Sequence, residues 1–414
     1  MKVLHISHSD ISGGAARAAY RLHRAQRSAG IDSKMLVLSK KSDDWSVCSP
    51  QGKFKNFLRV RLGPIVDRLQ KSSNVNFHSG NWLPSNILKE INTSDADVIN
   101  LHWINGETIS IEDIAKIKKP IVWTIHDMWL FCGSEHYSDD GEAARWRKGY
   151  SKNNRSEHDK GVDIDRLVWL RKKSAWKKPI HIVSPSKWLA DCASQSDLCC
   201  GYPVSVIPNT LNTEVYQPLD KAFCRNVLGL PQDKLIVLFG AMGGGNDPRK
   251  GYDLLQAALF ELAERLPTAS IECVVFGQSK PRQEPELPFK TLWLGHIHDD
   301  TTLALLYNAA TVMVVPSKQE AFGQTASEAQ ACGTPVVAFN CTGLTDVVEH
   351  QQTGYLAKAY DSADMAAGLH WILANPAECE RLGKNARWRA EKLWSTYKVV
   401  EQYQAVYSIE LERV

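Results

Sequence analysis

Short apolar runs recur along the chain and alternate with longer stretches whose apolar residues have helical spacing. The opening run VLHIS is followed by small residues and then by ARAAYRLHRAQRSAG, a helical pattern that ends at Gly30. Further strand candidates in this half are KMLVLS, DVINLHW (97–103), PIVWTIHD (120–127) and IHIVSPS (180–186). Because strands that alternate with helical segments favour a parallel sheet covered by helices, we predict an α/β fold.

The same alternation restarts in the second half of the chain. Its strand candidates are KLIVLFGA (234–241), IECVVFG (271–277), KTLWLGHI (290–297), TVMVVPS (311–317) and TPVVAFN (334–340). Between the halves, VIPNTLNTEVYQPLD shows no clear periodicity, which is typical of a linker. A chain of 414 residues also exceeds what one hydrophobic core usually supports. We therefore predict two doubly wound parallel sheets, in domains 1–208 and 209–392.

The last stretch of the chain, about 393–414, is a helical pattern that is unusually rich in aromatic residues. Such a stripe on a terminal helix indicates that the helix packs against something. One alternative is that it crosses back to the first domain, which is the assignment we adopt. The other is core packing within the second domain.

Charge is distributed unevenly between the two halves. Residues 1–200 hold 31 Lys and Arg against 22 Asp and Glu, whereas residues 201–414 hold 18 against 24. A basic domain suits nucleic acid, an anionic membrane or a phosphorylated substrate, and it also fits a merely solvated surface. Since no nucleic-acid-binding module is recognised, we expect no nucleic acid partner.

The sequence carries no apolar run long enough to span a bilayer, and its start is too polar for a signal peptide. We expect a cytoplasmic protein whose 10 cysteines are reduced thiols. The stretch FKNFLRVRLGPIVDRLQK interleaves apolar and basic residues and fits peripheral contact with an anionic membrane, at the inner face of the cytoplasmic membrane. Gly63-Pro64 is expected to interrupt its helix, and a plain surface helix is the alternative.

The string PSKQEAFGQTASEAQACGTPVV leaves an apolar strand, turns through a loop and enters a helix near Gly323. In open α/β sheets this edge is where ligands bind, and the first amides of the helix, at Gly323, Gln324 and Thr325, suit a diphosphate. Glu320 lies in the loop and Glu328 in the helix, so the two carboxylates flank the helix start. A carboxylate accepts hydrogen bonds from a diol, which suits Glu328 to ribose and Glu320 to a sugar.

Two glycine-rich loops follow other predicted strands. In AMGGGNDPRKGYDLL, glycines allow close approach of a ligand, and Lys250 beside Arg249 can neutralise phosphate. Gly13 and Gly14 lie in the first strand-to-helix loop, but the loop lacks the GxGxxG pattern and its spaced acidic partner. This argues against a dehydrogenase.

Together these strings resemble the retaining glycosyltransferases of family four, which have the GT-B fold of two Rossmann-like domains facing across a cleft. The similarity extends over nearly the whole chain. It is strongest to enzymes of bacterial capsule, exopolysaccharide and lipopolysaccharide assembly, through SGGAARAAYRLHRA, DVINLHW, VWTIHDMW, SPSKWLA, IPNT and DPRKGYDLL.

The resemblance implies roles for individual residues. Glu320 matches the glutamate that contacts the transferred sugar, and Glu328 matches the one that holds the ribose. Lys250 matches the phosphate-binding lysine, and His126 matches the histidine near the sugar C6 hydroxyl. The remaining matches are backbone positions beside the sugar at Phe322 and Gly323, and the loop facing the diphosphate at Gly13 and Gly14.

The resemblance also implies a nucleotide-sugar donor, a glycan or lipid-linked acceptor, and neither a cofactor nor a metal. One departure is Gly245, where the family commonly has an arginine, so Arg249 is the candidate replacement. Two alternatives stay open: a nucleotide-sugar epimerase on the same fold, or a catalytically inactive partner subunit.

Overall fold

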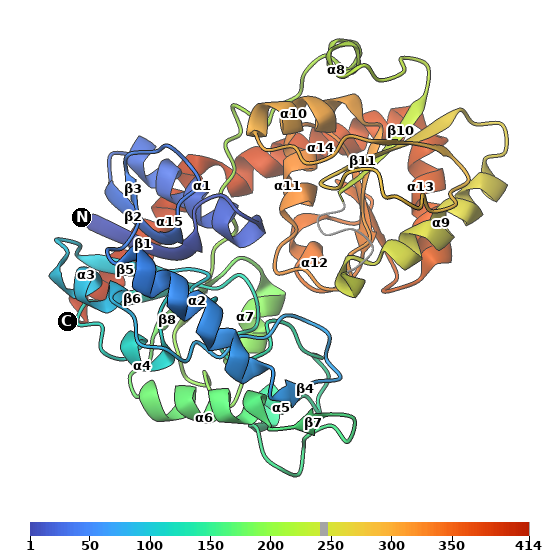
Figure 1. Cartoon of the computed structure of the whole chain (residues 1–414). Helices are drawn as coiled ribbons and strands as arrows, with labels where there is room; N and C mark the ends of the chain where they lie inside the picture. The colour runs from blue at the N-terminus through green and yellow to red at the C-terminus, as the bar shows by residue number, and fades with distance from the viewer. Residues whose placement is uncertain (241–246, 414) are drawn as a thin grey trace. The chain divides into compact units, whose positions relative to one another are not determined.

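The computed structural model describes residues 1–240 and 247–413 and divides into two compact units. The first unit comprises Met1–Thr210 and Val399–Val414, and the second comprises Leu211–Lys398. Figure 1 shows a sheet with flanking helices in each unit.

A seven-stranded parallel sheet forms the centre of the first unit. Its strand order is β3-β2-β1-β5-β6-β8-β9. The strands are β1 (Lys2–Ser9), β2 (Asp32–Ser39), β3 (Val47–Cys48), β5 (Val98–Leu101), β6 (Ile121–Thr124), β8 (His181–Ser184) and β9 (Val204–Val206). A separate antiparallel ribbon pairs β4 (Gln70–Lys71) with β7 (Lys160–Gly161).

Eight helices lie wholly or mainly in this unit among the described residues. They are α1 (Gly14–Ser28), α2 (Lys53–Asp67), α3 (Ile87–Thr93), α4 (Ile111–Ile114), α5 (Arg145–Lys148), α6 (Ile164–Ala175), α7 (Lys187–Ser194) and α15 (Thr396–Glu412).

The second unit holds a six-stranded parallel sheet in the order β12-β11-β10-β13-β14-β15. Its strands are β10 (Leu235–Gly240), β11 (Ile271–Phe276), β12 (Lys290–Trp293), β13 (Val312–Val315), β14 (Val336–Phe339) and β15 (Gly354–Ala357). Its helices are α8 (Lys221–Leu228), the 3-10 turn η2 (Pro248–Lys250), α9 (Tyr252–Arg265), α10 (Asp300–Ala309), α11 (Gln324–Ala331), α12 (Leu344–Val347), α13 (Ser362–Leu373) and α14 (Pro376–Trp394).

Both faces of the second sheet are buried. Ile236 and Leu238 of β10 join one apolar core cluster, while Val237 and Phe239 join a second cluster on the opposite face. Successive side chains of a strand point to opposite faces, so a strand covered on both sides needs apolar residues at every position. This explains why its sequence reads as a continuous apolar run. The two sheets with their helices are Rossmann-like domains, as predicted.

The terminal helix α15 is part of the core of the first unit. Its buried residues Val399, Val400, Tyr403, Val406 and Tyr407 form one stripe and pack in a cluster that includes residues of β1, β5, β6 and β8. In Figure 1 the red α15 lies beside the blue α1 of this unit, whose Leu22 and Ala25 share its cluster. The aromatic stripe seen in the sequence is therefore the packing face of this helix.

Helix α2 continues through Pro64, so the expected interruption at Gly63-Pro64 was wrong. Proline has a φ compatible with a helix and removes one backbone donor, and here it lies in the last turn, which limits the disturbance. No described helix is both long and apolar enough to cross a membrane.

Candidate active site

The candidate site of the second unit lies where β10 and β13 end side by side. These strands are paired neighbours in the sheet, although β11 and β12 separate them in the sequence. Helix α9, the next α-helix after β10, packs in the apolar cluster on one face of the sheet, and α11, the next helix after β13, packs in the cluster on the other face. In doubly wound sheets such a switch point opens a crevice at the carboxyl ends of the strands, where ligands bind.

Lys250 and Glu320 meet at this switch point. The Lys250 Nζ atom lies 2.5 Å from Glu320 Oε1, and the Ser317 hydroxyl donates to the same oxygen at 2.9 Å. The Lys250 side chain is 32% exposed and that of Glu320 is 19% exposed, so both remain accessible to a ligand. The structure thus joins the two residues that the sequence placed in separate loops.

Close backbone contact holds the two loops together. The Lys318 amide donates to the Arg249 carbonyl at 2.6 Å. Gly251 has φ +62°, and a Cβ atom there would lie 2.0 Å from the Pro316 carbonyl oxygen. Because any side chain would collide with this backbone, glycine at position 251 allows the lysine turn to approach the glutamate loop.

The main chain of Glu320 is anchored on both sides. Its amide donates to Thr342 Oγ1 at 3.1 Å, and its carbonyl accepts from the Gly343 amide at 3.0 Å. A Cβ atom at Gly343 would lie 2.4 Å from the Ala321 carbonyl oxygen. The segment after β14 therefore fixes the glutamate loop from the next strand along the sheet.

Helix α11 begins directly after this loop. Gly323 occupies its N-cap position with φ +97°, and Leu344 lies where a Cβ atom would extend. Gln324 and Thr325 form the first turn and are half-buried. Phe322 is buried and packs edge-on against Trp394, so its ring anchors the loop in the core and its backbone alone is available beside a ligand.

Glu328 is buried in the second turn of α11. Its Oε2 atom accepts a hydrogen bond of 2.6 Å from the hydroxyl of Tyr307 on α10. Burial, together with the charge of Glu328, raises the pKa of Tyr307 well above its ordinary value. A hydrogen bond to a carboxylate is stronger than one between neutral groups, so Tyr307 holds the Glu328 carboxylate in one orientation. Tyr307 escaped the sequence analysis because its helix reads as an ordinary apolar stripe.

Arg249 is paired close to its own position in the chain. Its guanidinium contacts both carboxylate oxygens of Asp247, at 3.1 and 2.7 Å, and its amide donates to the same side chain. Gly245, where the family resemblance implies an arginine, lies outside the described residues. The charge of Arg249 is thus balanced locally, whereas that of Lys250 is balanced by Glu320.

In the first unit, the loop after β1 also lies at a switch point, between β1 and β5. Gly13 is the N-cap of α1 with φ +91°, and Gly14 is the first residue of the helix. Apart from its chain neighbours, no atom of the described residues lies within 4 Å of where a Cβ of Gly13 would be, so the positive φ, and not lack of space, favours glycine there.

His126 follows β6 at the carboxyl edge of the first sheet and is half-buried. Its Nε2 atom lies 3.1 Å from Nδ1 of His102. Burial lowers the pKa of His126 to about 4. The ring is therefore neutral near pH 7, and a neutral imidazole has one donor and one acceptor nitrogen.

A second polar group at this edge was missed by the sequence analysis. Asp127 Oδ2 lies 2.6 Å from His136 Nδ1 and accepts from Trp103 Nε1 at 2.9 Å, and His136 Nε2 lies 2.6 Å from the Ser79 hydroxyl. Asp127, His136 and Ser79 are buried. The HD pair after a strand was visible in the sequence, but no local pattern linked it to Trp103, 24 residues before Asp127, or to His136, 9 residues after it.

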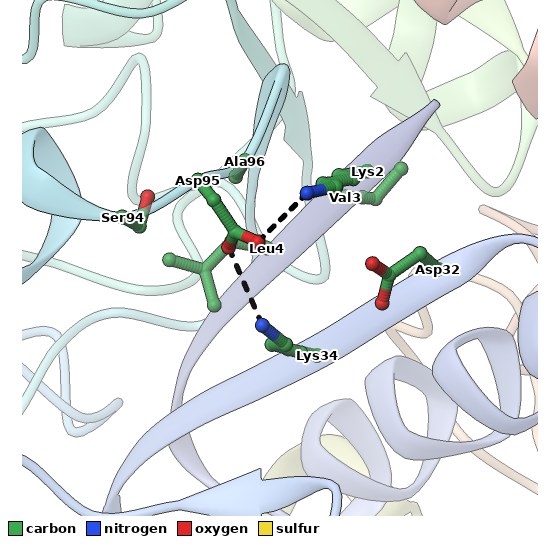
Figure 2. A pocket seen from close by; sticks show the side chains of 8 residues that line it. All are labelled: Lys2, Val3, Leu4, Asp32, Lys34, Ser94, Asp95 and Ala96. Carbon is green, nitrogen blue, oxygen red and sulfur yellow. Dashed lines mark hydrogen bonds and ion pairs between the residues drawn. The ribbon is translucent and has the colours of Figure 1, made fainter.

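A small hollow in the first unit lies at the opposite edge of its sheet. It is lined by residues at the amino ends of β1 and β2 and by the segment before β5, and Figure 2 shows Lys2 and Lys34 both turned toward Asp95. The ammonium groups lie 2.9 and 3.3 Å from the carboxylate. These exposed charges satisfy one another, and ligands of doubly wound sheets bind at the other edge.

Family models match both units. Residues 12–215 match the model described as Glycosyltransferase Family 4, and residues 220–389 match Glycosyl transferases group 1. Together the two models cover most of the chain.

Among curated proteins, a D-inositol 3-phosphate glycosyltransferase of Streptomyces bingchenggensis is 36% identical over 203 residues, which cover 46% of this chain and 44% of that protein. One from Thermobispora bispora is 34% identical over 225 residues, 51% of each chain. The matched region thus spans about half the length of these relatives.

Solved structures match over the whole chain. A sucrose-phosphate synthase from Thermosynechococcus elongatus superposes with a TM-score of 0.69 at 20% identity and covers 100% of both chains. HepE from Anabaena, in complex with UDP-glucose, superposes with a TM-score of 0.66 at 17% identity and covers 99% of both. WaaG, a glycosyltransferase involved in lipopolysaccharide biosynthesis, gives 0.60 at 16% identity over 98% of this chain and 99% of its own. At these identities the similarity establishes the fold.

Proposed function

This chain belongs to the family-four glycosyltransferases with the GT-B fold, and we propose that it transfers a sugar from a nucleotide diphosphate to a glycan or lipid-linked acceptor with retention of configuration and without a metal. The observation that carries the proposal is the contact between Lys250 and Glu320 at the switch point of the second sheet. A cation and a carboxylate held there suit the two halves of one donor, its diphosphate and its sugar.

The candidate site residues of the second unit divide the work of binding the donor. Lys250 and the amino end of α11 bind the diphosphate and stabilise the charge that develops as it leaves. Glu320 accepts hydrogen bonds from sugar hydroxyls, and Glu328, oriented by Tyr307, accepts those of the ribose. Gly323 lets the helix start approach the donor closely, and Gln324 and Thr325 provide first-turn amides.

The reaction itself breaks the bond between the sugar and the diphosphate oxygen and forms a bond from the acceptor oxygen on the same face of the sugar. The acceptor proton passes to the departing phosphate oxygen. No protein base is then needed, and the main requirement is electrostatic stabilisation of the leaving group. His126, at the carboxyl edge of the first sheet, is assigned to the sugar hydroxyls, and Gly13 and Gly14 to the diphosphate.

The descriptions of similar proteins suggest which donor and which class of acceptor to test first. WaaG is described as involved in lipopolysaccharide biosynthesis, and HepE has been solved with UDP-glucose. We place this chain in bacterial surface polysaccharide synthesis, with UDP-glucose as the first donor to test. The names of the curated relatives make D-inositol 3-phosphate a second acceptor to test.

Exposed apolar and basic residues on α2 support contact with an anionic membrane at the inner face of the cytoplasmic membrane. Phe54, Phe57, Leu62 and Ile65 are each more than half exposed, at 73%, 52%, 51% and 51%. Arg61 stacks on the Phe57 ring at 4.3 Å. A helix with an apolar face and adjoining cations suits the interface of an anionic bilayer, where a lipid-linked acceptor would be found.

A panel of nucleotide sugars tests the proposal. The true donor should raise the melting temperature, since a ligand bound only by the folded state stabilises it. With that donor and a glycan acceptor, the product should retain the anomeric configuration by NMR. Inversion would overturn the retaining mechanism. Free epimerised nucleotide sugar would instead indicate an epimerase, and donor binding with no turnover on any acceptor would indicate an inactive partner subunit.

A further inference from the structure

Three histidine side chains form a hydrogen-bonded row across the first sheet. His5 lies in β1, His102 directly follows β5, and His126 follows β6, three strands that are consecutive in the sheet. His5 Nδ1 lies 2.8 Å from His102 Nε2, and His102 Nδ1 lies 3.1 Å from His126 Nε2. His5 and His102 are fully or almost fully buried. The row therefore leads from the interior of the sheet to the half-buried ring of His126.

At the inner end of the row, His5 is hydrogen-bonded to Gln26, which is hydrogen-bonded in turn to Tyr407. Gln26 Oε1 lies 2.8 Å from His5 Nε2, and Gln26 Nε2 donates to the Tyr407 hydroxyl at 2.9 Å. The same hydroxyl accepts from Asn100 Nδ2 at 2.7 Å. Asn100 Oδ1 accepts from the Thr124 hydroxyl at 3.0 Å, and that hydroxyl also lies 3.1 Å from the Tyr403 hydroxyl. Tyr407 thus receives an amide hydrogen from each side, and Gln26 presents its oxygen to His5.

The positions of the protons follow from this orientation. An amide oxygen only accepts, so His5 must carry its proton on Nε2. Its Nδ1 then accepts, which requires the proton of His102 to lie on Nε2. The Nδ1 of His102 accepts in the same way from Nε2 of His126.

This row requires neutral rings. A neutral imidazole carries one N–H and one lone pair, and each link of the row uses one of each. Burial lowers the pKa of His5 and of His126 to about 4, and lowers that of His102 well below its ordinary value. All three rings are accordingly neutral near pH 7.

We propose that Gln26, His5 and His102 are positioning residues that hold His126 as its Nε2–H tautomer, so that its Nδ1 accepts a hydrogen bond from a hydroxyl of the substrate. The inference rests on the proposed function in one respect, the assignment of His126 to the sugar. In this arrangement His126 donates its Nε2 hydrogen to His102 and accepts a hydroxyl hydrogen from the substrate at Nδ1. Helix α15 thereby acts on the site, since Tyr407 sets the orientation of Gln26.

The tautomer can be read directly by long-range 1H–15N NMR of the full chain with 15N-labelled histidine. The resonances of His126, among 13 histidines, are assigned by their loss in His126→Gln. We expect His126 in the wild type to have a protonated Nε2 and an unprotonated Nδ1 at pH 7. A proton on Nδ1 would reverse the whole row and overturn the proposal.

A remote variant tests transmission along the row. Tyr407→Phe removes the acceptor of the Gln26 amide nitrogen, so the amide turns and the Nδ1–H tautomer of His126 becomes populated. The control is Glu410→Gln on the same helix, whose side chain pairs with His181 at 2.9 Å and does not enter the row. An unchanged His126 tautomer in Tyr407→Phe would refute the positioning role.

A nearer variant covers the case in which Tyr407→Phe fails to fold. His102→Gln keeps one acceptor and one donor and should preserve the His126 tautomer, whereas His102→Leu should give a mixture of tautomers. Equal spectra for His126 in these two variants would also refute the role. Because no turnover is needed, these outcomes stay separate from a failure of the transferase assignment.

Discussion

Lys250 Nζ and Glu320 Oε1 lie 2.5 Å apart, although 70 residues separate them in the chain. The contact exists because β10 and β13 are neighbours in the sheet and each carries one residue in the loop that follows it. A partly exposed ion pair adds little to stability. The contact holds the two side chains together at the switch point.

Replacing either member of this pair should strongly reduce transfer and leave the fold intact. We expect Lys250→Ala to lower turnover by about 100- to 1,000-fold, as for loss of one group that stabilises developing charge, and Glu320→Ala to act similarly. The matched control is Lys318→Ala, because Lys318 lies in the same loop but pairs with Asp253 at 3.1 Å. Near-normal activity in both site variants, with circular dichroism unchanged, would refute the site assignment.

A substitution of Arg249 tests whether this residue contributes to donor binding, as Lys250 is proposed to do. If Arg249 supplies the charge that Gly245 lacks, Arg249→Ala should weaken donor binding in calorimetry by about tenfold, the usual size of one lost charged hydrogen bond. A loss of thermal stability with unchanged donor affinity would instead limit Arg249 to its contact with Asp247.

Tyr307→Phe should weaken donor binding through Glu328. The variant removes the 2.6 Å hydrogen bond that orients the carboxylate, and a hydrogen bond to a charged group contributes about 1.5–3 kcal/mol. We expect the donor dissociation constant to rise about tenfold or more. Tyr252→Phe is the matched control, since the described residues provide no hydrogen-bond partner for its buried hydroxyl. Equal affinities in the two variants would contradict the ribose role of Glu328.

Stability should fall as the pH is lowered from about 6.5 toward about 4, because burial lowers the pKa of His5 from 6.5 to about 4. Above this window His5 is neutral in both the folded and the unfolded state, so it does not change the free energy of unfolding. Within it the unfolded chain binds a proton that the folded state does not, which favours unfolding. Urea titrations across this range should show a smaller slope against pH for His5→Asn. An identical slope would show that His5 does not contribute.

Metal removal should leave activity unchanged if Lys250 and the α11 amides stabilise the leaving diphosphate. Turnover is to be measured after dialysis against EDTA and again with added Mg²⁺ or Mn²⁺. Loss of activity with EDTA that a divalent ion restores would refute the metal-independent mechanism.

Binding to vesicles of acidic lipid should depend on α2. Sedimentation at low salt should show retention of the wild type and a clear loss for Phe57→Ser and Arg61→Glu, because the apolar face and its cations both favour the anionic interface. The control is Trp388→Ser on α14, which removes an aromatic side chain that is 61% exposed. Lack of wild-type retention, or equal losses in all variants, would refute the membrane role of α2.

The sequence by itself determined the fold class of this protein and pointed to its candidate site residues. The alternation of apolar runs and helical stripes predicted two parallel α/β sheets, because burial on both faces of a strand leaves a continuous apolar run. Glu320, Glu328 and Lys250 were candidates because each follows a predicted strand and lies near a predicted helix start. The family resemblance sharpened their roles, and the matching family models establish the family.

Tertiary structure alone decided which of these groups meet. Tyr307 reads in the sequence as one more apolar position, yet packing of α10 beside α11 places its hydroxyl on Glu328. His5, His102 and His126 are separated by long segments, and strand order places them side by side. Periodicity reports only whether a position is buried, whereas partners are set by which strands pair. The pairing of strands depends on the free energy of the whole sheet, so it cannot be predicted from any local stretch of the sequence.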